Sequence, residues 1–239
     1  MSQAVLHTLR EEQQTGIKGG LYHQMQISLA YNSNRIEGSR LTEEQTRYIY
    51  ETNTIDCAEG PAAVNDIIET ANHFHAFDCI LRRVEEPLTE TFIKELHGIV
   101  KGGVAEARLA WYPIGQYKSR PNIVGNRETT APGIVAAAMV KLLTRYENQP
   151  EDFAGILRFH MAFERIHPFQ DGNGRVGRLL MFKECLHFGV MPFIIDERYK
   201  LYYYRGLTEY DSEPGFLTDT LLSAQDKYAA LVRSFGIPE

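Results

Sequence analysis

Segments with helical periodicity follow one another along almost the whole chain, and this feature limits the protein to a fold made of packed helices. Apolar residues recur at helical spacing between residues that begin or end helices. Thr42 and Gln45 suit a capping box, Pro61 fits the first turn of a helix, and Thr89 suits an N-cap. We therefore predict helices over residues 3–14, 21–37, 42–52, 61–84, 89–100, 132–146, 151–166, 173–188, 197–210 and 214–234.

One irregular stretch, residues 103–131, interrupts this pattern. It contains residues that break helices (Pro113, Gly115, Pro121 and Gly125) and others that suit short strands (Tyr112, Tyr117, Ile123 and Val124). We expect a loop with a β-hairpin here. Strand signals elsewhere are too few for a doubly wound sheet, and the sequence has neither GxGxxG nor GxxxxGK[ST]. The predicted class is all-α.

Chain length and net charge limit the domain organisation and the classes of function. The 239 residues suit one compact domain with a helical N-terminal extension, and 44% hydrophobic residues are enough for a core. The formal net charge is −6, so the chain lacks the basic surplus that general nucleic-acid binding requires.

The cysteine spacing and the lengths of the apolar runs indicate the cellular compartment. Cys57, Cys79 and Cys185 form no CxxC pair, and we expect buried thiols in helices, as in a reducing compartment. Residues 1–16 contain no apolar run typical of a signal peptide, and no stretch is long enough to span a membrane. We predict a cytoplasmic protein that does not bind membranes.

The segment from His167 to Arg178, HPFQDGNGRVGR, lies between two predicted helices. Pro168 disfavours continuation of the first helix. Gly172 and Gly174 let the backbone approach a ligand closely, and the second helix then begins, so its free N–H groups point into the loop. A glycine turn before a helix N-terminus is an anion-binding site.

Charged side chains complete this segment. Arg175 and Arg178 share a helix face and suit phosphate oxygens, and Asp171 suits a Mg²⁺ ligand beside phosphates. His167 titrates near neutral pH and suits a general base. Each of these features alone is more often structural, but their contiguity predicts attack of a hydroxyl on a nucleotide phosphorus.

The same segment resembles the motif HxFx[D/E]GNGRxxR of the Fic family at every defined position. The likeness covers residues 60–205, which we interpret as a Fic catalytic core with a helical fold and a β-hairpin flap. Residues 1–59 would be an N-terminal helical extension, and residues 206–239 a C-terminal helical segment packed on the core. In relatives a Lys at the Gly174 position marks a kinase-like branch, so Gly174 favours nucleotidyl transfer over phosphoryl transfer.

The resemblance implies roles for these residues. His167 would deprotonate the target hydroxyl, and Asp171 would hold Mg²⁺ between the α- and β-phosphates of ATP. Gly172, Asn173 and Gly174 would form the anion hole, with Arg175 on the β-phosphate side and Arg178 on the γ-phosphate. Tyr203 and Leu207, four residues apart, are our choice for the adenine pocket. The flap residues Gln116, Tyr117, Lys118 and Ser119 would dock an extended segment of the target protein.

A second segment, Ser33–Gly38, is similar to the inhibitory motif [S/T]xxxE[G/N] of the family. There the glutamate pairs with the second arginine of the catalytic motif, so Glu37 would occupy Arg178 and repel the triphosphate. Ser33 would be the first residue of this motif. The implied subclass carries its inhibitory helix before the core.

These features together predict a protein adenylyltransferase that moves AMP from ATP to a hydroxyl of an unidentified target protein, the chain itself included. Alternatives are removal of AMP from a modified protein, transfer of another nucleotide, and nucleotide binding without turnover. A metal hydrolase using His160, His167 and Asp171 lacks HExxH spacing and leaves GNGR unexplained. Self-association into a homo-oligomer stays open.

Overall fold

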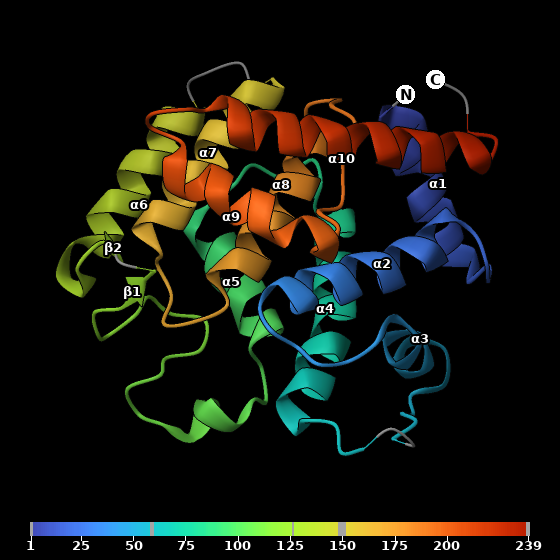
Figure 1. Cartoon of the computed structure of the whole chain (residues 1–239), viewed down its shortest axis with the longest axis horizontal. Coiled ribbons are helices and arrows are strands. Elements are labelled where there is room, and N and C mark those ends of the chain that lie inside the picture. Colours follow the sequence, from blue (N-terminus) through green and yellow to red (C-terminus); the bar gives the residue numbers. More distant parts are fainter. Residues whose placement is uncertain (1, 58–59, 126, 148–151, 238–239) are drawn as a thin grey trace.

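Helices make up most of the computed structural model of the chain (Figure 1). The structure describes residues 2–57, 60–125, 127–147 and 152–237. In these residues the α-helices are α1 (Ser2–Thr15), α2 (Leu21–Ile36), α3 (Glu43–Thr52), α4 (Val64–Arg82), α5 (Glu90–Val100), α6 (Pro132–Glu147), α7 (Phe153–Ile166), α8 (Asn173–His187), α9 (Lys200–Glu209) and α10 (Gly215–Ser234). Short 3₁₀ helices, η1 (Ala105–Arg108) and η2 (Glu197–Tyr199), join them. The predicted all-α class is confirmed.

Capping side chains begin two of these helices where the sequence predicts. At α3, Thr42 Oγ1 accepts the Gln45 N–H at 3.1 Å and Gln45 Oε1 accepts the Thr42 N–H at 3.0 Å, which is a complete capping box. At α5, Thr89 Oγ1 accepts the Phe92 N–H at 3.1 Å. The predicted start of α4 at Pro61 is wrong. Ala63 is extended and the helix begins after it, because the fixed φ of proline suits an extended segment as well as a helix.

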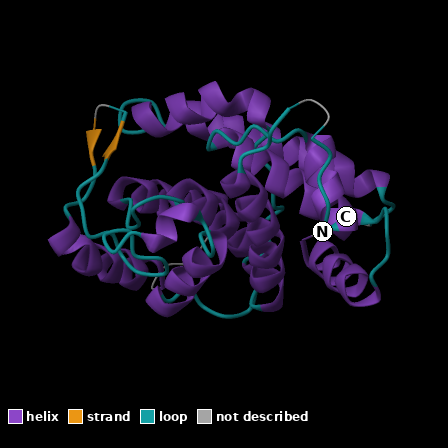
Figure 2. Cartoon of the chain, turned by 90° about the horizontal axis from the view of Figure 1, so that it is seen from below, coloured by secondary structure: helices purple, strands orange, loops and turns teal. Residues whose placement is uncertain are grey.

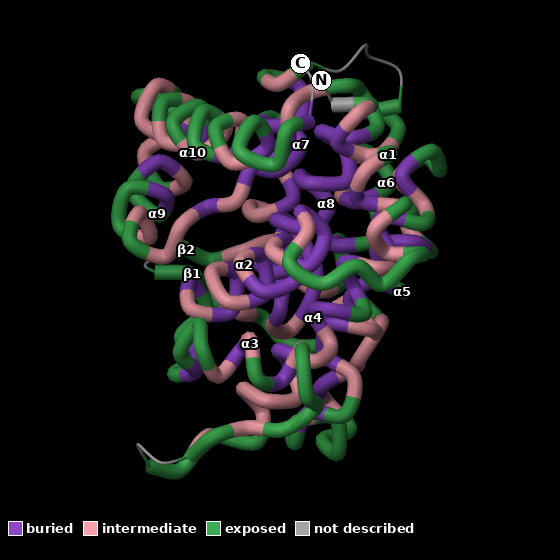
Figure 3. The backbone as a smooth tube through the Cα atoms, turned by 90° about the vertical axis from the view of Figure 1, so that its right-hand side faces the viewer, coloured by how far each residue is buried: buried purple, intermediate pink, exposed green. Residues whose placement is uncertain are grey.

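Helix α8 lies at the centre of the molecule (Figure 3). Residues Asn173 to Leu186 are all buried, because α1, α2, α4, α5 and α7 contact this helix. Polar side chains on a helix buried on all sides must find partners, since an unpaired buried polar group costs roughly 1–3 kcal/mol. The polar motif residues on this helix, Asn173, Arg175 and Arg178, therefore lie inside the fold.

A single large hydrophobic cluster connects α1 with α10 through α4 and α8. The ring of Phe182 contacts Phe77 edge-on at 5.4 Å and Tyr228 at 5.9 Å between centroids. A smaller cluster of Ala30, Leu41, Ile49 and Phe74 joins α2, α3 and α4.

A short antiparallel hairpin is the strand structure of the described residues (Figure 2). Strand β1 (Ile123–Val124) pairs with β2 (Arg127–Glu128), with Ile123 opposite Glu128. Gly125 in the turn has φ +60°, which glycine adopts without steric cost. The predicted strands at Tyr112 and Tyr117 are wrong, because tertiary contacts hold both rings: Tyr112 donates to Asp171 and Tyr117 packs on Phe169.

The three cysteines are free, and two of them, Cys79 and Cys185, are buried in helices as expected. The expectation of burial is wrong for Cys57, which is exposed because it lies in the segment after α3 and in no helix. Within the described ranges, no helix combines the length and the apolar character needed to cross a bilayer.

Candidate active site

His167 ends α7 in the left-handed region, with φ +51° and ψ +61°. Only two non-glycine residues of the described chain have positive φ, and such conformations persist where surrounding contacts enforce them. The His167 N–H donates to Phe163 O at 2.9 Å, and Pro168 O accepts the Lys118 N–H at 2.9 Å. These contacts hold the His167 backbone in this conformation.

The His167 side chain is 17% exposed, and its surroundings favour the neutral form. Burial, followed by the nearby Lys118 ammonium, lowers the pKa of His167 to about 4. Nδ1 lies 4.0 Å from Glu164 Oε2, and burial raises the pKa of Glu164 to about 7. A neutral imidazole has an unprotonated ring nitrogen that is able to accept a proton.

The loop between His167 and α8 is closed by the motif residue Asn173 and by His97, which the sequence pattern did not identify. Asn173 Oδ1 accepts the Phe169 N–H at 2.8 Å, and Asn173 Nδ2 donates to Phe169 O at 3.0 Å. The Phe169 ring stacks on His97 at 3.9 Å between centroids. His97 Nδ1 accepts the Gly115 N–H at 2.9 Å, so Nε2 carries the proton and donates to Asp171 O at 3.1 Å. His97 lies on the buried face of α5, and nothing in its local sequence distinguishes it from a core residue.

The first turn of α8 presents free backbone N–H groups beside glycine residues. Gly172 has φ +79°, and a Cβ at Gly174 would collide with the carboxylate of Glu37. Glycine is therefore required at position 174 for an anion to lie against the start of this helix. In this structure that anion is the Glu37 side chain.

Ser33 and Glu37, one turn apart at the end of α2, both contact Arg178. Arg178 Nη2 donates to Glu37 Oε1 at 2.8 Å and to Ser33 O at 2.9 Å, and its Nε donates to Ser33 Oγ at 3.0 Å. The Arg178 side chain is 5% exposed, so this ion pair is screened little by water. The structure thus brings together the residues of the two motifs singled out in the sequence.

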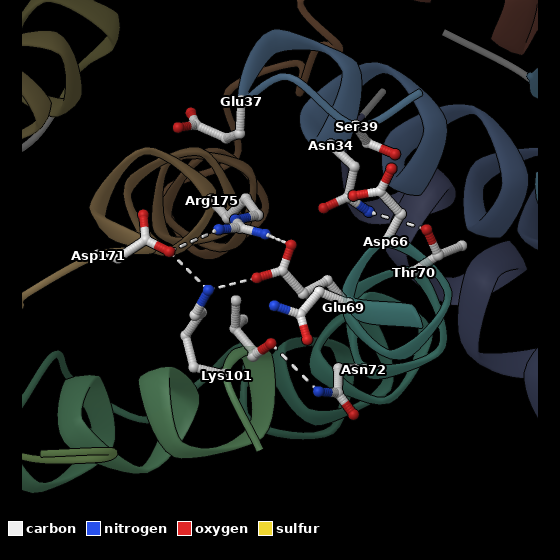
Figure 4. A network of polar contacts seen from close by, with 12 residues as sticks. Asn34, Glu37, Ser39, Asp66, Glu69, Thr70, Asn72, Lys101, Asp171 and Arg175 are labelled. Atoms are coloured by element: carbon white, nitrogen blue, oxygen red, sulfur yellow. Dashed lines mark hydrogen bonds and ion pairs between the residues drawn. The ribbon is translucent and has the colours of Figure 1, made fainter. Parts of the chain in front are cut away.

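Asp171 and Arg175 belong to a network on the other flank of α8, with Glu69 of α4 and Lys101 at the end of α5 (Figure 4). Arg175 donates to Glu69 and, at 3.3 Å, to Asp171 Oδ2. Tyr112 donates to the same oxygen at 3.1 Å. Burial alone would raise the pKa of Asp171, but the Arg175 and Lys101 cations hold it well below its usual value. The sequence pattern did not identify Glu69 or Lys101, because their roles arise only when α4 and α5 meet the loop.

A cavity of about 700 Å³ opens between the hairpin, α7, α9 and the start of α8. Motif residues on its wall are His167, Gly174, Arg178 and Glu37. Asp171, Gly172, Asn173 and Arg175 lie next to this wall but do not line it. Its remaining lining residues are Ile123, Val124, Gly125, Arg127, Thr129, Met161, Glu164, Arg165, Tyr203, Tyr204, Leu207 and Thr208.

Tyr203 and Leu207, predicted for the adenine pocket, both line this cavity. The Tyr203 ring is nearly fully buried, and its hydroxyl makes a 2.7 Å hydrogen bond with His160 Nε2. Tyr204, the neighbouring cavity residue, donates its hydroxyl to Ile36 O at 3.0 Å.

The segment predicted to dock a target, residues 116–119, lies ahead of the hairpin and does not line the cavity. Lys118 is buried, and its ammonium donates to Asn122 Oδ1 at 2.7 Å and to Thr129 Oγ1 at 2.6 Å. Ser119 Oγ donates to Trp111 O at 2.7 Å. The residues around the hairpin that line the cavity are Ile123, Val124, Gly125, Arg127 and Thr129, and docking by residues 116–119 stays a prediction.

Comparisons with known proteins agree with this geometry. A profile of the Fic/DOC family matches residues 87–185. A protein adenylyltransferase Fic of Drosophila willistoni is 30% identical over 217 residues, covering 83% of this chain and 40% of that protein. The protein of the same name from Nematostella vectensis is 29% identical over 184 residues, covering 73% of this chain and 41% of that protein. The chain therefore spans about two fifths of these curated relatives.

Solved structures extend the likeness to the whole fold. A Fic-domain-containing signaling protein from Bacteroides thetaiotaomicron superposes with a TM-score of 0.74 and 25% identity, covering 99% of this chain and 94% of that one. Fic-1 from C. elegans has the same fold, with a TM-score of 0.72, 20% identity, and coverage of 98% of this chain and 72% of that one. The motif, the helical core with its hairpin and these relatives lead to one conclusion: the chain belongs to the Fic family.

Proposed function

We propose that this chain is a protein adenylyltransferase, which transfers AMP from ATP to a hydroxyl side chain of a target protein, with itself as one substrate. The observation that carries the proposal is the common cavity, where the neutral imidazole of His167, the start of α8 and Arg178 face one space of about 700 Å³. The names of the two curated relatives support the same reaction. The cytoplasmic location and the self-association stay predictions.

In the proposed complex, the triphosphate of ATP takes the place of the Glu37 carboxylate at the start of α8. Backbone N–H groups of the first turn and the Arg178 guanidinium would bind the phosphate oxygens, with Arg175 close behind. The adenine would lie along Tyr203 and Leu207 of α9.

Asp171 fits the role of a Mg²⁺ ligand. Its side chain is 46% exposed beside the proposed phosphate site, and a carboxylate oxygen is the donor that Mg²⁺ prefers. When bound, the ion would neutralise charge that develops on the phosphates during transfer. In the structure, the ion pairs of Asp171 use Oδ2 (Figure 4).

The proton step is assigned to His167. Its unprotonated ring nitrogen would take the proton of the target hydroxyl as the hydroxyl oxygen forms a bond to the α-phosphorus. The bond from that phosphorus to the β-phosphate oxygen then breaks, and pyrophosphate leaves. Positioning of the hydroxyl in line with this bond supplies much of the rate, and the hairpin at the cavity edge is suited to hold an extended target segment.

We further propose that Glu37 inhibits the enzyme that carries it. Its carboxylate is paired with Arg178 at 2.8 Å and lies against Gly174, so it competes with phosphate for both binding groups. Charge-assisted hydrogen bonds of this kind contribute about 1.5–3 kcal/mol. Release of the pair therefore corresponds to about a 10- to 100-fold gain in productive ATP binding.

Incorporation of radiolabelled AMP tests both assignments. We expect Glu37→Gly to raise the initial rate about 10- to 100-fold, because a competing anion is removed. His167→Ala in the Glu37→Gly background should abolish labelling. Glu213→Gly, an exposed acidic residue of the loop after α9, is the matched control and should behave as wild type.

Mass spectrometry of the labelled protein identifies the reaction. An added AMP on a hydroxyl side chain supports the proposal, whereas added uridylate or phosphate contradicts it. Equal labelling of wild type and Glu37→Gly would exclude the inhibitory role of Glu37. Release of AMP from a modified protein, without net labelling, would point to the reverse activity.

A further inference from the structure

Lys101 places a buried ammonium group directly on the carboxylate that is proposed to bind the metal (Figure 4). The side chain is 3% exposed, and Nζ donates to Asp171 Oδ2 at 2.5 Å and to Glu69 Oε1. The stem of Lys101 packs against Gly172, where a Cβ would come within 3.0 Å of Lys101 Cγ. The ammonium therefore has a fixed position between two carboxylates, as a bound cation would.

The charges around Lys101 alternate in a closed ring. Lys101 bridges Asp171 and Glu69, and Arg175 bridges the same two carboxylates from α8. Two cations and two carboxylates leave the ring without net charge. A divalent ion that approaches Asp171 from solvent thus meets a carboxylate whose charge is already compensated within the protein.

We propose that Lys101 is a positioning residue that acts as a tethered cation: it compensates Asp171 in the nucleotide-free protein, so that divalent metal binds only together with the triphosphate. The negative charge of the nucleotide supplies the attraction that the compensated Asp171 lacks. The inference relies on the proposed function for one point, the choice of Asp171 as metal ligand. Its consequence concerns metal binding and is measurable without any transfer of AMP.

A purely structural role for Lys101 would change the stability of the protein and not its affinity for metal. If the ammonium served only to connect α4, α5 and the loop, its removal would lower stability without changing the affinity for metal. If it compensates Asp171, its removal leaves two carboxylates with one remaining cation. A divalent ion would then take the place of the ammonium between Glu69 and Asp171.

Titration of the nucleotide-free full chain with Mn²⁺, followed by the electron paramagnetic resonance signal of the free ion, distinguishes the two. We expect Lys101→Met, which keeps the apolar stem, to bind Mn²⁺ at least about tenfold more tightly than wild type. Lys101→Arg keeps the charge and should resemble wild type. Lys141→Met, at an exposed position of α6, is the matched control and should also resemble wild type.

Further variants make the outcome decisive. Addition of Asp171→Asn to Lys101→Met should remove the gained site, and a non-hydrolysable ATP analogue should give Glu37→Gly, which lacks the competing carboxylate, saturable Mn²⁺ binding beyond that of the analogue alone. If Lys101→Met does not fold, as judged by circular dichroism, Lys101→Gln replaces it, with the same expected gain. Equal Mn²⁺ affinity of wild type and the neutral variants, or a gain that survives Asp171→Asn, would overturn the inference. Failure of AMP transfer with a positive Mn²⁺ result would instead count against the proposed function alone.

Discussion

His167 combines a left-handed backbone with a neutral, largely buried imidazole, and both properties come from its neighbours. The bend at Pro168 and the Lys118 N–H hold the backbone, while burial and the Lys118 ammonium hold the ring neutral. The sequence predicts that this histidine is a general base and that the helix ends at this point. It does not predict the conformation, because Pro168 restricts its predecessor only by disfavouring the helical region.

The protonation of His167 is directly measurable. Because its pKa is lowered to about 4 in the nucleotide-free protein, the imidazole should stay neutral down to about pH 4. Two-dimensional NMR of ¹⁵N-labelled histidine rings between pH 8 and pH 5.5, above the range in which we expect acid unfolding, would follow it, with His167→Gln to assign the signal. A ring that titrates near the ordinary value of about 6.5 would contradict the described burial.

At the scale of elements, the end of α2 is held against α9 and η2. Tyr204 of α9 donates its hydroxyl to Ile36 O at 3.0 Å, next to Glu37. Asn32 Oδ1 accepts the Glu197 N–H at 2.8 Å from η2. The position of the Glu37 carboxylate therefore depends on a contact made by a residue outside both sequence motifs.

Tyr204→Phe should release part of the inhibition by Glu37. A net hydrogen bond contributes about 0.5–1.5 kcal/mol, so the initial rate of AMP transfer is expected to rise about 2- to 10-fold. In the Glu37→Gly background, the same substitution should have no further effect, since no carboxylate remains to be positioned. Tyr202→Phe, on the exposed side of α9, is the control. A similar rise in both backgrounds would show that Tyr204 acts on the reaction by another route.

The sequence predicts secondary structure well where the residues that determine it are neighbours in the chain. The capping residues Thr42 and Thr89 and the order GNGR at the start of α8 are readable in one window of sequence. The residues that contact the catalytic loop cannot be found in this way. Glu69, Lys101 and His97 come from α4 and α5, and they resemble ordinary helix residues until the helices pack. The hairpin was predicted in the right stretch, but its strands are limited to Ile123–Val124 and Arg127–Glu128.

At the scale of the whole molecule, four buried imidazoles make the fold sensitive to acid. Burial lowers the pKa of His73 and His160 to about 3, and of His97 and His167 to about 4. In the unfolded chain these groups titrate near 6.5, so below that pH the unfolded state binds more protons and stability falls. Glu164 acts in the opposite sense, because its raised pKa of about 7 makes the folded state bind an extra proton between about pH 4.5 and 7.

The balance of these groups predicts a steep loss of stability on acidification. Each histidine contributes up to about 1.4 kcal/mol per pH unit below 6.5, and Glu164 offsets one of the four, which leaves up to about 4 kcal/mol per pH unit. Since domains are stable by about 5–15 kcal/mol, we expect unfolding between about pH 5 and pH 3. Urea unfolding at pH 7, 6 and 5 measures the slope.

His73→Leu, which removes one such group from α4, should lower the slope by about 1.4 kcal/mol per pH unit. The exposed His7 of α1, replaced by the same residue, serves as the control. A free energy of unfolding that does not change from pH 7 to pH 5 would mean that these imidazoles are accessible to protons in the folded protein.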